Sequence, residues 1–154
     1  MNKVFAKLVF LMLFINTILS AESMFLLTKL QKVYLVVENY SNHIPMNLKA
    51  DIIEEMRATT DELNIDTDGY SYRTLAFMLY DTSIGNHEVL NVDLILGEEV
   101  KRLDDAEDVY ALTYDKRKQI VTDDKTKEEI HEELIEKVEL LLNEFMEQYK
   151  EDNI

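Results

Sequence analysis

The feature that most constrains the fold is an apolar stripe near the end of the chain. Its residues recur at helical spacing over about five turns: Ile130, Leu134, Val138, Leu141, Phe145 and Tyr149. Thr126 and Glu129 have the spacing of a capping box, so we expect a helix that opens at Thr126 and ends near Lys150. A helix with one apolar face must bury that face against another layer of the fold.

Period-two patterns upstream predict a sheet as that layer. Strands are expected at residues 32–38, 73–81, 88–103 and 108–115. Gly85-Asn86 suits a two-residue hairpin loop between the second and third strands. Gly97 interrupts the long third strand, which predicts a bulge or bend there.

Large residues occupy both faces of the expected strands. In the second strand, three apolar residues on one face alternate with three on the other: Leu75, Phe77 and Leu79 against Ala76, Met78 and Tyr80. In the fourth strand, strict alternation places Tyr110, Leu112 and Tyr114 on one face. One layer of helices covers only one face of a sheet, so a partner or a second copy of the chain is expected to cover the rest.

A second helix is predicted between the first two strands. Asn47 is a plausible N-cap, and an apolar stripe runs from Leu48 to Leu63. The expected order is therefore strand, helix, three strands in a meander, helix. This order predicts an α+β two-layer sandwich in which two helices cover one face of a four-stranded, mostly antiparallel sheet.

The N-terminal residues have the build of a secretory signal peptide. Met1 to Lys7 carry two lysines and no acid, and Leu8 to Leu19 are apolar except for Asn16 and Thr17. Residues 1–21 are thus predicted to be the leader, with cleavage near Ala21, either after Ala21 or after Ser23. Residues 22–154 would then form one exported domain, periplasmic or secreted. The alternative is an uncleaved leader that anchors the protein in a membrane.

The charge balance restricts the partners. The chain has 31 acidic and 16 basic residues and a net charge of -15, and removal of Lys3 and Lys7 with the leader would give about -17. Such a charge disfavours nucleic acid and anionic lipid as partners and favours solubility or a cationic partner. The chain has no cysteine, which excludes disulfides, a lipid-anchored cysteine and thiolate chemistry.

One segment resembles the first half of a calcium loop. Asn64, Asp66 and Asp68 place oxygen ligands at alternate positions before Gly69. The twelfth position, where a bidentate glutamate would complete the ligand set, is Leu75. The segment is therefore a candidate for a weak calcium site, and the other interpretation is an Asx-rich turn between a helix and a strand.

The remaining motifs predict no catalytic site and no cofactor. His43, His87 and His131 are isolated in loop, turn and helix, and no nucleophile elbow, phosphate loop or dinucleotide fingerprint occurs. Lys101-Arg102 and Lys116 to Lys118 are expected to pair with nearby acids. Five tyrosines in or beside the strands are expected to cover a sheet face rather than to line a ligand groove: Tyr70, Tyr72, Tyr80, Tyr110 and Tyr114.

The long strand reads Val-Leu-Asn-Val-Asp-Leu-Ile-Leu-Gly-Glu-Glu-Val-Lys-Arg-Leu, and the fourth strand contains Ala-Leu-Thr-Tyr, residues 111–114. With the leader and the closing helix, this pattern resembles a loose group of small exported bacterial proteins of unknown function. The resemblance covers Lys32 to Tyr149. It implies export and the fold, and it assigns no catalytic residue.

Together these observations predict a non-catalytic protein of the bacterial cell envelope that binds another protein. The uncovered sheet face or an exposed sheet edge is the expected contact surface. A domain that binds a small ligand or calcium through Asp66, Asp68 and nearby tyrosines is the alternative.

Overall fold

The computed structural model describes residues 27–45 and 47–154. The predicted leader and its cleavage site near Ala21 lie outside the described residues. The elements follow the expected order: β1 (Tyr34–Asn39), α2 (Leu48–Glu62), β2 (Arg73–Ile84), β3 (His87–Lys101), β4 (Asp108–Val121) and α3 (Lys127–Asp152).

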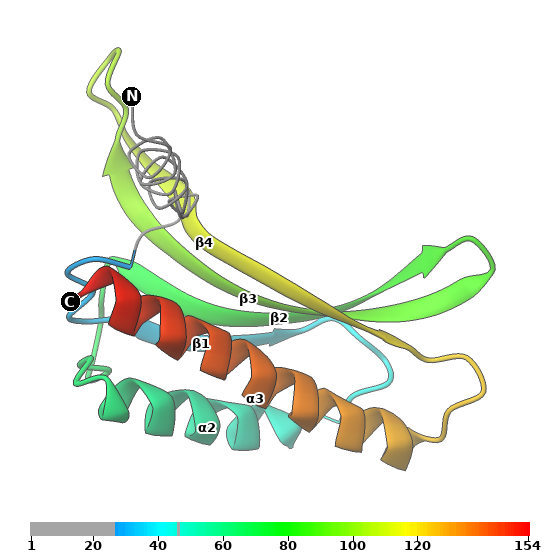
Figure 1. The fold of residues 1–154 in the computed structure, drawn as a ribbon. Helices are drawn as coiled ribbons and strands as arrows, with labels where there is room; N and C mark the ends of the chain where they lie inside the picture. The colour runs from blue at the N-terminus through cyan, green and yellow to red at the C-terminus, as the bar shows by residue number, and fades with distance from the viewer. Residues whose placement is uncertain (1–26, 46) are drawn as a thin grey trace, which may run out of the picture.

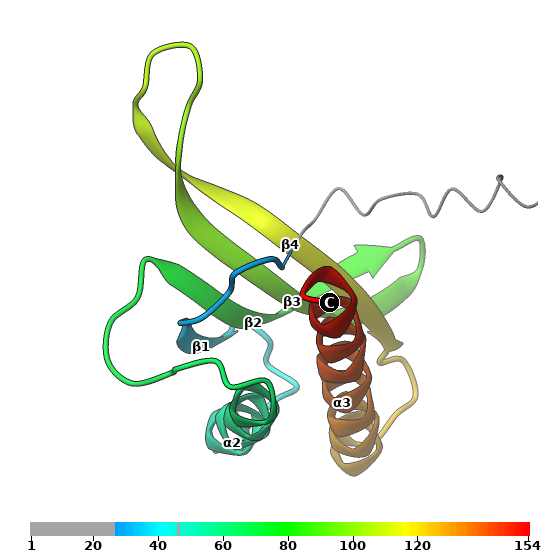
Figure 2. The same cartoon turned by 60° about the vertical axis from the view of Figure 1, so that its left-hand side comes forward.

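The four strands form one mixed sheet in the order β1-β2-β3-β4. β1 pairs with β2 in parallel, because α2 connects them and returns the chain to the same end of the sheet. β2, β3 and β4 pair antiparallel. Figure 1 and Figure 2 show both helices on the same side of this sheet. The predicted α+β sandwich with two helices on one face is thereby confirmed.

The main core lies between the helices and the sheet. α2 packs on β1, α3 packs on β3 and β4, and the two helices contact each other. Leu75, Phe77 and Leu79 of β2 point into this layer and are fully buried. The predicted stripe of α3 is buried from Ile130 to Phe145 and half-buried at Tyr149.

The two helix starts differ from each other. At α3 the capping box is present: Glu129 N donates to Thr126 Oγ1 at 3.2 Å, and Thr126 N donates to Glu129 Oε2 at 2.8 Å. At α2 Asn47 holds the cap position, but its side chain makes no capping hydrogen bond. Its backbone is already helical, with φ -67 and ψ -25, whereas a capping side chain normally needs an extended backbone.

The β2–β3 hairpin closes as predicted but extends further. Ile84 pairs with His87, so the loop is Gly85-Asn86, and Gly85 has the positive φ of +64 that a type II′ turn needs. The expected second strand ended at residue 81, yet β2 continues to Ile84. Backbone pairing with β3 holds Thr82, Ser83 and Ile84 in the sheet, although all three are exposed.

A bulge in β4 corrects one prediction. The predicted irregularity at Gly97 exists: Leu96 pairs with Tyr114 and Gly97 with Leu112, so Thr113 is the extra residue. The bulge shifts the alternation by one residue. Tyr114 therefore faces the helices and is fully buried, while Tyr110 and Leu112 lie on the opposite face. The expectation that all three share a face was wrong.

The two ends of the described chain are joined at one end of the sandwich. Leu27 and Leu30 are buried. Leu27 N donates to Asp152 Oδ2 at 2.6 Å, and Tyr149 OH donates to the Leu30 carbonyl at 3.3 Å. Asn153 also accepts from Lys29 N at 3.1 Å. We call this arrangement the terminal clasp; it attaches residues 27–30 to the last turns of α3.

Candidate functional site

The sheet face opposite the helices is the candidate site, and we call it the open face. The register defines its central rows: Tyr34, Thr74, Gly97 and Leu112; then Val36, Ala76, Ile95 and Asp115; then Glu38, Met78, Asp93 and Arg117. Tyr110, beside Glu99, continues the face at one end. Tyr34, Tyr110 and Leu112 are 47%, 61% and 53% exposed, which is unusual for such large side chains on a sheet.

A buried carboxylate occupies the middle of the open face. Asp93 accepts two hydrogen bonds of 2.7 Å from Nε and Nη2 of Arg117 and one of 3.0 Å from Tyr80 OH. The Arg117 guanidinium also lies 5.8 Å from the centre of the Tyr80 ring. Burial, followed by the hydrogen bond to Asp93, raises the pKa of Tyr80. The hydrogen bonds to Asp93 likewise raise the pKa of Arg117.

The same network extends along the sheet through Asn91. Its Nδ2 donates to Thr82 Oγ1 at 2.8 Å, and its Oδ1 accepts from Gln119 Nε2 at 2.8 Å. Both oxygens of Asp93 are also occupied by donors. These polar groups satisfy one another, so their arrangement holds three strands in register rather than presenting a free base or nucleophile.

Four tyrosines gather at the end of the open face where β2 begins. Tyr34 of β1, Tyr70 and Tyr72 of the α2–β2 loop, and Tyr110 of β4 line a hollow of about 240 Å³. We call it the tyrosine hollow. Glu99 and Asp108 also line it. The Tyr70 and Tyr72 rings pack edge to face with centroids 5.4 Å apart.

Gly97 determines how Tyr110 lies in the hollow. A Cβ atom at Gly97 would be 2.4 Å from Cε1 and 2.8 Å from the hydroxyl oxygen of Tyr110. The Tyr110 ring therefore lies across the backbone of β3 in space that only a glycine leaves open. The glycine that the sequence marked as an irregularity also shapes one wall of the hollow.

Of the three predicted calcium residues, Asp66 has other side-chain partners in this structure. The Asp66 carboxylate pairs with Lys32 Nζ at 2.8 Å and accepts from Asp68 N at 2.8 Å. The hydrogen bond from Lys32 lowers the pKa of Asp66 most strongly, followed by that from Asp68. Asn64 has a positive φ of +56 at the end of α2, as in an Asx-rich helix-to-strand turn. Across residues 27–45 and 47–154, no group of three or more potential ligands is arranged to hold a metal ion.

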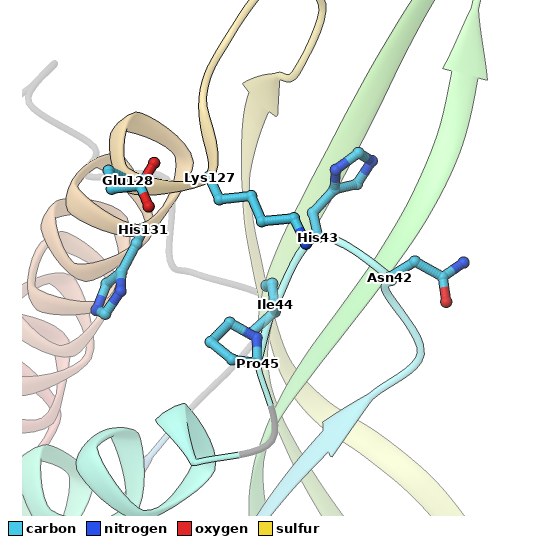
Figure 3. A pocket seen from close by; sticks show the side chains of 7 residues that line it. All are labelled: Asn42, His43, Ile44, Pro45, Lys127, Glu128 and His131. Atoms are coloured by element: carbon cyan, nitrogen blue, oxygen red, sulfur yellow. The ribbon is translucent and has the colours of Figure 1, made fainter.

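The histidines are not brought together into a ligand pair. His43 and His131 line a second pocket of about 270 Å³ between the β1–α2 loop and the start of α3. Figure 3 shows their rings pointing away from each other, with Lys127 extending between them. His87 lies elsewhere, with Nδ1 2.6 Å from Asp123 Oδ2.

In the basic clusters, every residue except Lys116 pairs with an acid among the described residues. Lys101 contacts Asp108 at 2.5 Å and Arg102 contacts Asp105 at 2.9 Å. Arg117 binds Asp93, and Lys118 reaches Glu144 of α3 at 2.5 Å. β4 continues to Val121, whereas the fourth strand was expected to end at residue 115, so Lys116 to Lys118 lie within the strand.

Sequence reasoning did not single out Tyr34 as a site residue. Its signal was available, since Tyr34 alternates with Val33 and Leu35 and so belongs on the other face of the first strand. Tyr70 and Tyr72 were expected to cover a sheet face rather than to line a groove, but both line the hollow. Their convergence with Tyr34 depends on the path of the α2–β2 loop.

Comparisons with protein-family models, with curated proteins and with solved structures find no match to this chain. In the part of the chain that the structure describes, no helix has the length and apolar character needed to span a membrane.

Proposed function

We propose that this protein is a non-catalytic, exported protein of the bacterial cell envelope that binds another protein through its open face. The observation that carries the proposal is the set of large, exposed side chains at one end of that face: Tyr34, Tyr70, Tyr72, Tyr110 and Leu112. Tyrosines enriched on an otherwise polar surface are typical of protein interfaces.

The two edge strands of the sheet differ in whether they could pair with an added strand from a partner. β4 carries the Thr113 bulge and the basic run Lys116 to Lys118, which are features that prevent another strand from pairing. β1 has neither, and its one charged residue is Glu38. The chain just before β1 is already paired on this edge, because Val33 N donates to the Asp66 carbonyl at 2.9 Å and Asp66 N donates to the Gln31 carbonyl at 2.9 Å. An extended segment of the partner would therefore add beside β1 beyond this point, from Leu35 onward.

The export part of the proposal rests on the leader pattern. N-terminal sequencing of the protein recovered from the envelope or the medium of a bacterial host tests it directly. A mature terminus at Glu22 or Met24 supports export, and an intact Met1 on protein that remains in the cytoplasm contradicts it.

The binding part is tested with a matched pair of surface variants. Leu112 on the open face and Leu140 on α3 are both exposed, at 53% and 41%. We expect tagged wild-type protein and Leu140→Asp to capture the same envelope proteins after crosslinking, and Leu112→Asp to lose them. Equal capture by both variants would show that the open face is not the contact surface. Wild-type protein that captures nothing beyond an acidic control protein would contradict the binding function itself.

A further inference from the structure

We propose that the tyrosine hollow receives a lysine or arginine side chain from an extended basic segment of the partner protein. This inference rests on the proposed binding function and specifies the chemistry of the partner. It is based on the observation that four tyrosines and two acidic residues from separate elements line one hollow.

The hollow has the chemistry that selects a cation. The faces of tyrosine rings attract ammonium and guanidinium groups within about 6 Å. Glu99 adds a carboxylate and makes no ion pair with the described residues, whereas Asp108 is already paired with Lys101. An incoming cation would therefore meet aromatic rings and one available negative charge.

The size of the hollow fits one side chain. Sites for drug-sized ligands occupy about 300–1,000 Å³, and this hollow has about 240 Å³. Its walls come from all four strands and the α2–β2 loop, so the hollow lies across the end of the sheet. A segment added along β1 from Leu35 onward would have its end near Tyr34, where a side chain can enter the hollow.

Charge complementarity identifies the occupant as a basic segment rather than a second copy of this chain. The net charge of -15 favours encounter with a cationic partner. Two copies of so acidic a protein would repel each other on approach, and the acids that line the hollow would face the acids of the second copy.

The experiment is a titration of the protein with two synthetic ten-residue peptides, one alternating lysine with threonine and one alternating glutamate with threonine, by calorimetry at low salt. We expect only the lysine peptide to bind. Tyr110→Ala and Glu99→Gln should each weaken its binding by roughly two- to fivefold, the loss of one cation–π or one charge contact. Gly97→Ala, which displaces the Tyr110 ring, should weaken it similarly.

Matched variants separate this site from general charge attraction. Glu139 and Leu140 are exposed on α3, and neither lines the hollow. Glu139→Gln and Leu140→Ala should leave the affinity unchanged. Equal weakening by the hollow variants and these controls would overturn the inference, and so would equal binding of both peptides.

Two further outcomes distinguish this inference from the proposed function. If Leu112→Asp loses the captured proteins while the lysine peptide does not bind, the open face binds proteins but the basic partner is wrong. If the protein sediments as a dimer that Tyr110→Ala dissociates, the occupant is a second copy and the inference is likewise wrong.

Discussion

The two faces of β2 show how one strand serves two purposes. Leu75, Phe77 and Leu79 face the helices and have no exposed surface. On the open face, Ala76 is buried, Met78 is half-buried, and the Tyr80 hydroxyl donates a hydrogen bond to Asp93. The helix side is held by apolar burial, whereas the open side combines hydrogen-bonded polar groups with exposed aromatic rings. Sequence alternation alone makes the two sides look more alike than they are.

The largest test of this difference is a pair of leucine truncations. Leu94→Ala removes a fully buried side chain of β3 from the helix side and should lower the free energy of unfolding by about 2–5 kcal/mol. Leu112→Ala on the open face should cost less than about 1 kcal/mol, because half of that side chain is already in water. Urea unfolding of both variants measures the difference, and equal losses would mean that the open face is covered in solution.

The next test concerns the polar network of the open face. Asp93→Ala leaves Arg117 and the Tyr80 hydroxyl without their shared acceptor and should cost about 1–3 kcal/mol. Arg117 is half exposed and can recover water, which keeps the loss below that of a fully buried ion pair. A double-mutant cycle with Arg117→Gln should show coupling between the two residues. Independent, additive losses would contradict the network.

Two hydroxyl deletions should differ in their effect on stability, because only one of the hydroxyl groups has a hydrogen-bond partner in the described part of the chain. Tyr80→Phe removes a hydrogen bond to Asp93 and should cost about 0.5–1.5 kcal/mol. Tyr114→Phe removes a buried hydroxyl that has no hydrogen-bond partner among the described residues, so stability should be unchanged or rise by up to about 1 kcal/mol. The Tyr114 ring keeps its edge-to-face contact with Phe145 in either case. Thermal unfolding compares the two, and a loss in Tyr114→Phe would reveal a partner for its hydroxyl in solution.

The smallest expected effect is a dependence of the melting temperature on acid pH, caused by Glu129 at the start of α3. Hydrogen bonds from Thr126 hold the pKa of Glu129 below its usual 4.5. The folded state therefore favours the ionised carboxylate, and its contribution is present above pH 4.5 and is lost as the pH falls through the lowered pKa. Melting temperatures measured from pH 6 to pH 3 should fall less in Glu129→Ala than in the wild type. Identical acid profiles would show that this cap does not contribute.

The sequence predicts elements whose pattern is local. The stripe from Ile130 to Tyr149 and the Thr126 capping box lead directly to α3, because helical spacing and caps depend on neighbours within a few residues. The Gly85-Asn86 loop is predictable for the same reason. In each case the structure confirms the element within a few residues.

The site depends on information that no local pattern contains. Asp93 and Arg117 are 24 residues apart and meet only because the β3–β4 register aligns them. Gly97 indicates an irregularity, but the sequence does not show which strand carries the extra residue. The pairing places this residue in β4, so Tyr114 faces the helices and Tyr110 lies on the open face. The hollow further requires the loop with Tyr70 and Tyr72 to lie beside β1.

The terminal clasp has a consequence for the order of events when the protein is made. Contacts such as Leu27 to Asp152 span 125 residues, so the core around Leu27 and Leu30 cannot close before the last turn of α3 is available. While only the strands have been synthesised, α3 is missing and this end of the domain cannot pack. If the chain crosses a membrane N-terminus first, the domain can finish folding only after Asp152 has crossed. Until then residues 27–30 lack their partners in α3.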